Sequence, residues 1–331
     1  MIIRTTAYPR AALIGNPSDG YFGKTIAFTF SNFSARVTLY ESPELVIVPS
    51  RRDGSTFDSI AALYEDVRLF GYYGGIRLLK SAIKSFYGYC RDHEIELHDQ
   101  NFTIRYESDI PNLVGLAGSS AIITAAMRAL MAFFDVTIPK PQLANLIRAV
   151  ENRELGISAG LQDRVAQVYQ GMVYMDFDKR LFDKQGFGHY ETLHPDRLPP
   201  LYIAYRTDLS EGSEVFHNHI RERFERGEHE VVDAMAFWAN LTVQARGALE
   251  QGDWQKLGEL MDANFDKRKQ IFQLSEGNLR MVATARSVGA SAKFTGSGGA
   301  IIGTYADEAM FAKLTEAFAS QNIRVFKPTL V

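Results

Sequence analysis

The sequence contains a single cysteine, Cys90, among its 331 residues. One cysteine can neither close a disulfide within the chain nor supply a cysteine cluster for zinc. The seven histidines are scattered without the spacing of a metal site, so we exclude metal-dependent hydrolysis. The chain also lacks a signal peptide at its start and an apolar stretch long enough to cross a bilayer. We therefore expect a cytoplasmic protein that does not associate with membranes.

Neither sign of charge dominates, since 36 basic and 39 acidic residues give a formal net charge of −3. A nucleic-acid-coating surface needs a basic excess, so no nucleic-acid partner is expected. Apolar residues at 46% and charged residues at 23% are typical of a soluble globular protein. The chain is longer than one hydrophobic core usually serves. We predict two domains, residues 1–195 and 196–331, with the junction in the polar, proline-rich stretch 183–200.

Local patterns predict a mixture of strands and helices. Strands are expected at 11–14, within 25–38, and at 101–110, 201–206 and 323–326, and a strand–turn–strand at 291–305. Helices are expected at 55–70, at about 75–92, from the turn near 118 to 134, at 141–154, repeatedly over 211–288, and from about 307. Because these elements do not alternate as regular βαβ units, the expected fold class is α+β.

One segment, NLVGLAGSSAIITAAMRAL (112–130), places a glycine- and serine-rich turn directly before an alanine-rich helix. Gly115, Gly118, Ser119 and Ser120 lie in this turn. Backbone N–H groups at a helix start and the positive end of its dipole favour an anion, most commonly a phosphate. The segment matches neither the Walker loop nor the dinucleotide fingerprint. The alternative is that the serines only cap a buried helix and the glycines make a tight turn.

Three further segments change this balance: YPRAALIGNPSDGYFGKTIAF, ENRELGISAGLQDR and KFTGSGGAIIG. With the turn, they resemble in order and spacing the motifs of the GHMP small-molecule kinases, which include galactokinase, homoserine kinase, mevalonate kinase and phosphomevalonate kinase. The resemblance covers nearly the whole chain, and GNPSD and NFDKRKQIF look closest to the glucuronokinase branch. It implies a two-domain fold with an N-terminal ribosomal-protein-S5-like domain and a C-terminal ferredoxin-like α/β sandwich.

The resemblance also implies a function: an ATP- and Mg²⁺-dependent sugar 1-kinase that converts D-glucuronate to glucuronate 1-phosphate. The alternatives are a kinase for a galactose-, arabinose- or heptose-type sugar, and a non-catalytic sensor of sugar and nucleotide. The expected partner is a small uronic acid, and the expected assembly is a monomer or a homodimer.

The family's motif implies that the glycine-rich turn wraps the ATP phosphates. The residues of this turn are Gly115, Leu116, Ala117, Gly118, Ser119 and Ser120. Ser120 and Glu151 match the Mg²⁺ ligands, and a serine with one carboxylate offers the hard oxygen ligands that Mg²⁺ prefers. Without the family's spacing, Glu151 is one more charged residue on a solvated helix face, with Glu154 as its competitor.

Asp163 matches the catalytic aspartate of the family, and Arg10 matches a basic residue near that aspartate and the γ-phosphate. An aspartate beside an arginine has a lowered pKa, so we expect Asp163 to position the substrate hydroxyl rather than to act as a strong base. The alternative for Asp163 is a helix N-cap after Gly160.

The GNPSD motif occupies the family's substrate site. Asp19 matches a carboxylate that grips sugar hydroxyls, and Asn16 stands where galactokinases carry a glutamate. Since an amide can donate to an acidic sugar that a carboxylate would repel, Asn16 indicates a uronic acid; the alternative is a plain turn between strands. The remaining substrate-binding candidates are Lys24, Arg268, Gly296, Ser297 and Gly298, the two cations being candidates to meet the substrate carboxylate.

Overall fold

We analysed a computed structural model that describes residues 1–50, 53, 59–61, 63–64, 74–206 and 214–331. The chain divides into two compact units that are both discontinuous in sequence. The first unit comprises Met1–Pro9, Phe33–Ile110 and Ala117–Ala159, and the second comprises Arg10–Asn32, Pro111–Leu116 and Gly160–Val331. The predicted domain boundary between 195 and 196 stays a prediction.

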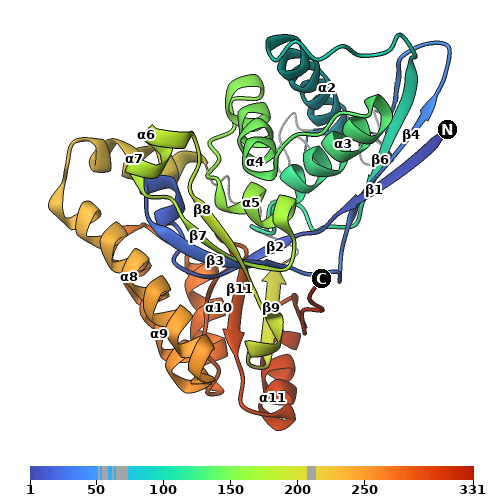
Figure 1. Ribbon diagram of the computed structural model, residues 1–331. Coiled ribbons are helices and arrows are strands. Elements are labelled where there is room, and N and C mark those ends of the chain that lie inside the picture. Colours follow the sequence, from blue (N-terminus) through green and yellow to red (C-terminus); the bar gives the residue numbers. More distant parts are fainter. Residues whose placement is uncertain (51–52, 54–58, 62, 65–73, 207–213) are drawn as a thin grey trace. The chain divides into compact units, whose positions relative to one another are not determined.

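The described residues of the first unit form one four-stranded sheet in the order β1-β4-β6-β5. Its strands are β1 (Ile2–Ala7), β4 (Ala35–Glu41), β5 (Val46–Val48) and β6 (Phe102–Ser108). Only the β5–β6 pair is parallel. Its helices are α2 (Gly75–Asp92), α3 (Gly118–Phe134), α4 (Lys140–Ala149) and the following π-helix η3 (Val150–Glu154). Helix α3 packs on β1 and β4 and contacts α2 and α4 (Figure 1).

The alanine-rich sequence of α3 explains its central place in this unit. Small side chains allow close packing around the helix, and most of its residues from Ser120 to Phe133 are buried. A helix that is apolar nearly all round is stable only inside a core. The sheet on one side and the two neighbouring helices supply this core.

The second unit contains two four-stranded antiparallel sheets. One has the order β2-β3-β7-β8, with strands Arg10–Ile14, Lys24–Thr29, Met172–Asp176 and His189–Leu193. The other has the order β10-β11-β9-β12, with strands Lys293–Phe294, Ala300–Thr304, Leu201–Arg206 and Ile323–Phe326.

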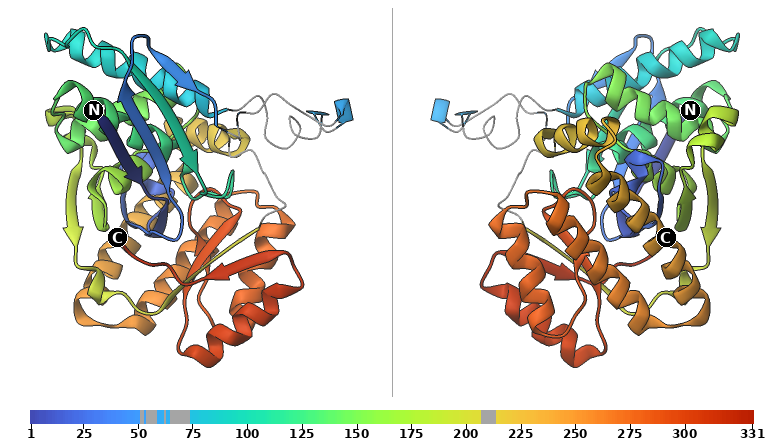
Figure 2. Two further views of the ribbon diagram at one scale, coloured as in Figure 1. Left: turned by 90° about the vertical axis from the view of Figure 1, so that its right-hand side faces the viewer. Right: turned by 90° about the vertical axis from the view of Figure 1, so that its left-hand side faces the viewer.

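The helices of the second unit are α5 (Gln162–Tyr169), α6 (Lys179–Gln185), α7 (Glu214–Glu225), α8 (His229–Gln251), α9 (Trp254–Ile271), α10 (Glu276–Ser287) and α11 (Glu308–Ala319). Its described residues also include two short 3₁₀ helices, η1 (Ser18–Tyr21) and η4 (Pro195–Arg197). Helices α8 and α9 run side by side as the gold-to-orange pair in Figure 2. Helix α5 packs on β2, β3 and β7, and α9 packs on β2, β10 and β11.

The α+β class and most of the predicted elements are confirmed. The helix predicted over 55–70 lies mostly outside the described residues, as does the start of the stretch 211–288. The strands β1, β5 and β7 and the helices α5 and α6 were not predicted. Nor was the strand β8, because its residues fall in the stretch that we expected to be a junction. The strand is polar and pairs only with β7 at a sheet edge, so it lacks the hydrophobic alternation that marks a half-buried strand.

Candidate functional site

Asp163 lies in the first turn of α5 and is held by two arginines. Arg10 Nε donates to Asp163 Oδ1 at 2.5 Å, and Arg164 Nη1 lies 3.2 Å from Asp163 Oδ2. The N-cap of α5 is Leu161, without a capping side chain, so the alternative that Asp163 caps this helix is wrong. The aspartate side chain remains 18% exposed, whereas each arginine is 6% exposed. The carboxylate is therefore fixed from its buried side.

Arg10 connects this carboxylate to two backbone segments. Its Nη1 donates to the carbonyl oxygens of Gly115 at 2.7 Å and Thr295 at 3.0 Å. Its own backbone N–H donates to the Leu116 carbonyl at 3.2 Å. The structure thus brings the first part of the glycine-rich turn, the loop after β10 and Asp163 around one buried guanidinium.

Glycine is required where this loop meets the turn. A Cβ added at Gly296 would lie 2.6 Å from the Gly115 carbonyl oxygen and 3.0 Å from Arg10 Nη2. A Cβ at Gly115 would lie 2.7 Å from the Gly298 carbonyl oxygen, and Gly115 has a φ of +72°. Any side chain at these positions would separate the two segments, so their glycines permit the close approach.

Asp19, in η1, is a second carboxylate close to Asp163. The backbone N–H of Gln162 donates to Asp19 Oδ2 at 3.4 Å, and a Cβ at Gly160 would lie 2.2 Å from the same oxygen. Asp19 therefore lies directly against the turn that leads into α5. The structure brings both predicted carboxylates, Asp19 and Asp163, to one site.

The two carboxylates differ in acidity. Burial raises the pKa of Asp19 to about 6, and the negative charge of Asp163 acts in the same direction. Burial alone would raise the pKa of Asp163 as well, but the charges of Arg10 and Arg164 outweigh it and hold this pKa below its ordinary value. The lowered pKa of Asp163 is the direction predicted from its pairing with Arg10. At neutral pH Asp163 is firmly ionised.

Asn16 and Arg268 meet at the Gly296 carbonyl oxygen. Asn16 Nδ2 donates to it at 3.3 Å and Arg268 Nη1 at 2.9 Å. Arg268 Nη2 also donates to the Ser297 carbonyl at 3.3 Å. In the part of the chain that the structure describes, Asn16 Oδ1 has no hydrogen-bond partner. A buried acceptor without a partner indicates that something else binds there.

Lys24 is engaged elsewhere. It lies opposite Asp176 across the β3–β7 ladder, and its Nζ forms an ion pair with that carboxylate. Gly298, the last predicted substrate contact, packs against the Asn278 side chain, with 3.0 Å between its added Cβ and Nδ2. Of the two cations predicted from the sequence, only Arg268 joins the group around Asn16 and Asp19.

The second part of the glycine-rich turn, from Ala117, belongs to the first unit and opens α3. Ala117 is the N-cap with a φ of +61°, and no side chain caps the helix. The suggestion that Ser119 or Ser120 serves as this N-cap is therefore wrong. The buried Ser120 Oγ donates to the Ala117 carbonyl at 3.2 Å. The first turn of α3 carries no acidic residue, so the positive end of its dipole is not neutralised within the helix.

Glu151 lies in the same unit, in the π-helix η3 that extends α4. Glu151 is only 2% exposed, so it does not lie on a solvated helix face. That alternative is wrong. Glu154, its competitor in the sequence, pairs with Lys84 at 2.5 Å. π-Helical turns often occur at functional sites, and a buried carboxylate needs a cation or donors.

Among the described residues, no group of three or more His, Cys, Asp or Glu side chains is arranged to bind a metal ion. A cation held by Ser120 and Glu151 would have to take its other ligands from a phosphate substrate and water, as Mg²⁺ commonly does. The oxygen donors of these two residues fit Mg²⁺. Within the same described residues, no helix has the length and hydrophobicity needed to span a bilayer.

Sequence reasoning missed two site residues in this group and one buried lysine behind it. Arg164 and Gln162 flank Asp163, and their neighbouring position was the only signal. Lys293 is fully buried, and its Nζ donates to the carbonyl oxygens of Ala12 at 2.7 Å and Phe294 at 2.8 Å. Burial and the charges of Arg268 and Arg10 hold its pKa well below the ordinary value. A lysine at the start of a short strand gave no indication of this.

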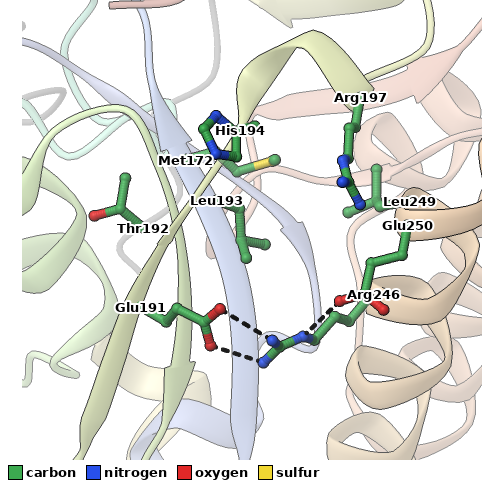
Figure 3. Close-up of a pocket in the computed structure, with 9 residues that line it drawn as sticks. All are labelled: Met172, Glu191, Thr192, Leu193, His194, Arg197, Arg246, Leu249 and Glu250. Atoms are coloured by element: carbon green, nitrogen blue, oxygen red, sulfur yellow. Dashed lines mark hydrogen bonds and ion pairs between the residues drawn. The ribbon is translucent and has the colours of Figure 1, made fainter.

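A separate pocket of about 240 Å³ lies between the end of β8 and the end of α8, and Figure 3 shows the residues that line it. Its charged residues pair with one another: Arg246 donates to both carboxylate oxygens of Glu191, at 2.9 and 3.0 Å, and to Glu250 at 3.1 Å. None of the predicted site residues lines it. It therefore holds none of the chemistry described above.

Comparison with known proteins identifies the family. The family model described as GHMP kinases N terminal domain matches residues 77–171, and the model described as GHMP kinases C terminal matches residues 245–323. Arabidopsis thaliana probable glucuronokinase 2 is 45% identical over 303 residues, covering 89% of this chain and 82% of the relative. Arabidopsis thaliana glucuronokinase 1 is 43% identical over 305 residues, covering 91% and 84%.

A solved structure supports the same assignment at the level of the fold. The Lactococcus lactis galactokinase complexed with galactose superposes with a TM-score of 0.79 at 16% identity, covering 99% of this chain and 93% of the galactokinase. The chain belongs to the GHMP kinase family and has its two-domain fold. Its nearly full-length similarity to glucuronokinases identifies it as a sugar kinase of that family.

Proposed function

We propose that this protein is an ATP- and Mg²⁺-dependent kinase that phosphorylates the anomeric hydroxyl of D-glucuronate to give glucuronate 1-phosphate. The main support is the ion pair of Arg10 and Asp163 beside Asp19, in a chain 45% identical to a probable glucuronokinase. The family accounts for the use of ATP, and the acidic sugar comes from these relatives.

Asp163 orients the attacking hydroxyl in this proposal. Its lowered pKa makes it a weak base, so its contribution is to accept the hydrogen bond of the anomeric hydroxyl and aim the oxygen at the γ-phosphorus. An anomeric hydroxyl is more acidic than an ordinary alcohol and suits a weak base. Phosphoryl transfer depends mainly on such positioning and on stabilising charge. Arg10 supplies the positive charge next to the reacting oxygen.

The phosphates of ATP are assigned to the turn from Gly115 to Ser120. The N-terminal end of α3 and the small residues before it are suited to an anion. Ser120 and Glu151 are proposed to hold Mg²⁺, which when bound offsets the charge of the phosphates. The burial of both side chains supports this.

The sugar is assigned to the group around Asp19. The Asp19 carboxylate accepts hydrogen bonds from sugar hydroxyls, and Asn16 and Arg268 lie on the side of the Gly296–Gly298 loop. Lys24 is paired with Asp176, so we assign it no role in binding the sugar while this ion pair is intact.

A coupled assay of ADP release tests the proposal. Wild-type protein with Mg·ATP is offered glucuronate, galacturonate, galactose, arabinose and glucose, with D163N as the matched inactive control. Turnover of glucuronate above the others supports the proposal. Faster turnover of a neutral sugar supports a different sugar kinase, and no turnover on any sugar, with nucleotide still bound, supports a non-catalytic sensor.

The cytoplasmic location and the monomeric or homodimeric state stay predictions. Cell fractionation tests the first, and light scattering of the purified chain tests the second.

A further inference from the structure

The cations of the second unit named above differ in whether a carboxylate neutralises them. Arg10 and Arg164 share Asp163, and Lys24 pairs with Asp176. Arg268 and Arg221 have no carboxylate within ion-pair distance among the described residues. These two guanidiniums therefore form no ion pair in that part of the chain, and the charge of Asp19 acts on Arg268 only from a greater distance.

Arg268 is the more deeply buried of the two arginines. It is 3% exposed, and its guanidinium lies 5.1 Å from the ring centres of both Phe272 and Phe294. Burial lowers its pKa to about 10, which leaves it a cation at neutral pH. Arginine is almost never fully buried without a charged partner, since burying an unpaired charge costs several kcal/mol.

Most donors of Arg268 are also uncommitted. A guanidinium has five N–H donors, and two are used on the Gly296 and Ser297 carbonyls. Its Nε–H has no acceptor in the part of the chain that the structure describes. The guanidinium thus retains both the charge and the donors to bind an anion.

Arg221 approaches the same neighbourhood from α7. Its guanidinium lies 5.5 Å from the ring centre of Tyr21, and its Nη2 lies 3.6 Å from a Cβ built on Gly20, the residue after Asp19. The ring of Tyr21 also contacts Phe224 at 5.0 Å, which fixes α7 against η1. An arginine that stacks on an aromatic ring keeps its N–H donors free at the edge of the guanidinium plane, where they can bind a carboxylate in a bidentate manner.

The same unit offers an internal comparison. Arg246, on α8, stacks on Tyr174 at 5.0 Å much as Arg221 stacks on Tyr21. Its N–H groups, however, are taken by Glu191 and Glu250, as Figure 3 shows. Arg221 also stacks on an aromatic ring, but no carboxylate of the described residues forms an ion pair with it. A substrate that carries a carboxylate can supply this ion-pair partner.

We propose that Arg221 and Arg268 are the specificity-determining residues of the sugar site, and that they select an acidic sugar by binding its carboxylate. This inference rests on the proposed function, since it concerns the sugar that the kinase accepts. Asn16 assists from the same side, because its Nδ2 shares the Gly296 carbonyl with Arg268. An amide there adds no negative charge to oppose the substrate.

Calorimetric binding of sugars to the wild-type chain is the first test. We expect glucuronate to bind roughly 30-fold or more tightly than glucuronamide, its neutral amide, because removing one partner of a desolvated charge pair has an effect of this size. Equal affinity for the two would overturn the inference. Tighter binding of glucose 6-phosphate than of glucuronate would also overturn it, since the site would then select a phosphate.

Three variants compare the arginines: R221Q, R268Q and the matched control R246Q. For R221Q and R268Q we expect kcat/KM to fall at least tenfold more for glucuronate than for glucuronamide, so that the preference for the acid drops by that factor. R246Q should keep the wild-type preference. A loss of the same factor on both sugars in R221Q and R268Q would show a merely structural role and sink the proposal.

The folding of each variant and the binding of sugar are measured separately from turnover. Thermal melting is recorded for each variant, and if R268Q does not fold, R268K and R221Q are compared instead, because lysine keeps the charge and loses the fork of donors. If the wild type phosphorylates no sugar, the proposed function fails, while the calorimetric preference for glucuronate still reports separately on the two arginines.

Discussion

Replacing Asp19 by asparagine should stabilise the protein while impairing its activity. Burial raises the pKa of Asp19 from 3.8 to about 6, so the folded chain binds a proton at this site more tightly than the unfolded chain. The carboxylate therefore costs stability as the pH rises from about 4 to about 6, and the full cost is present above that range. A shift of about 2 pKa units corresponds to about 3 kcal/mol at pH 7 and about 1.5 kcal/mol at pH 5.

Urea unfolding of the wild type and D19N between pH 5 and pH 8 measures this difference. We expect D19N to be the more stable protein at pH 7, with an advantage that shrinks by about half towards pH 5. The amide keeps the shape of the carboxylate and can still accept from the Gln162 N–H. The control is D183N, which removes an exposed carboxylate that pairs with Lys179 and should change stability by less than about 0.5 kcal/mol at every pH.

The same variant tests the role of Asp19 towards the sugar. An ionised carboxylate accepts hydrogen bonds from two hydroxyls, whereas the protonated form or an amide accepts fewer. Wild-type kcat/KM for the sugar should therefore fall as the pH drops through about 6, and D19N should be weak with no such limb. A D19N protein that is no more stable than wild type at pH 7, or that shows the wild-type acid limb, would refute the reasoning.

Three further substitutions test the rest of the site. D163N should lower kcat on the order of 10³-fold or more with nucleotide affinity unchanged; unchanged turnover in the ADP-release assay would remove its role. G160A places a Cβ 2.2 Å from Asp19 Oδ2 and should cost about 100-fold in kcat/KM for the sugar, by displacing that carboxylate, while Mg·ATP affinity is kept. S120A and E151Q should each weaken Mg·ATP binding roughly tenfold without weakening sugar binding in calorimetry; an equal loss on both ligands contradicts the metal assignment.

The sequence predicts the strands and helices well where one hydrophobic pattern extends over several turns. The alanine-rich helix α3 begins at Gly118 and ends at Phe134, because an apolar run of this length after a glycine turn has no alternative structure of similar stability. The edge strand β8 was missed, since its pairing with β7 supplies hydrogen bonds that its own residues do not indicate. The interleaving of the two units along the chain also depends on contacts distant in sequence.

The site residues likewise differ in whether the sequence alone could predict their contacts. The pairing of Arg10 and Asp163 across 153 positions was expected only because both matched family motifs. The engagement of Lys24 by Asp176 was missed, because it depends on the register of two strands. Arg221 was missed for a related reason: α7 holds two arginines, and only packing on Tyr21 distinguishes this one from Arg223, which pairs with Glu228.

In the proposed function, the distribution of charge lets one site serve both catalysis and the selection of an acidic sugar. Asp163 uses Arg10 and Arg164 to stay ionised, so those two cations are partly neutralised before any substrate arrives. An acidic sugar would be repelled by Asp19 and Asp163 unless further positive charge lay nearby. Arg268 is proposed to provide it, since it forms no ion pair among the described residues and the neighbouring Asn16 is an uncharged amide. In the proposed function, the amide at position 16 and the buried Arg268 therefore act together to accept an anionic substrate.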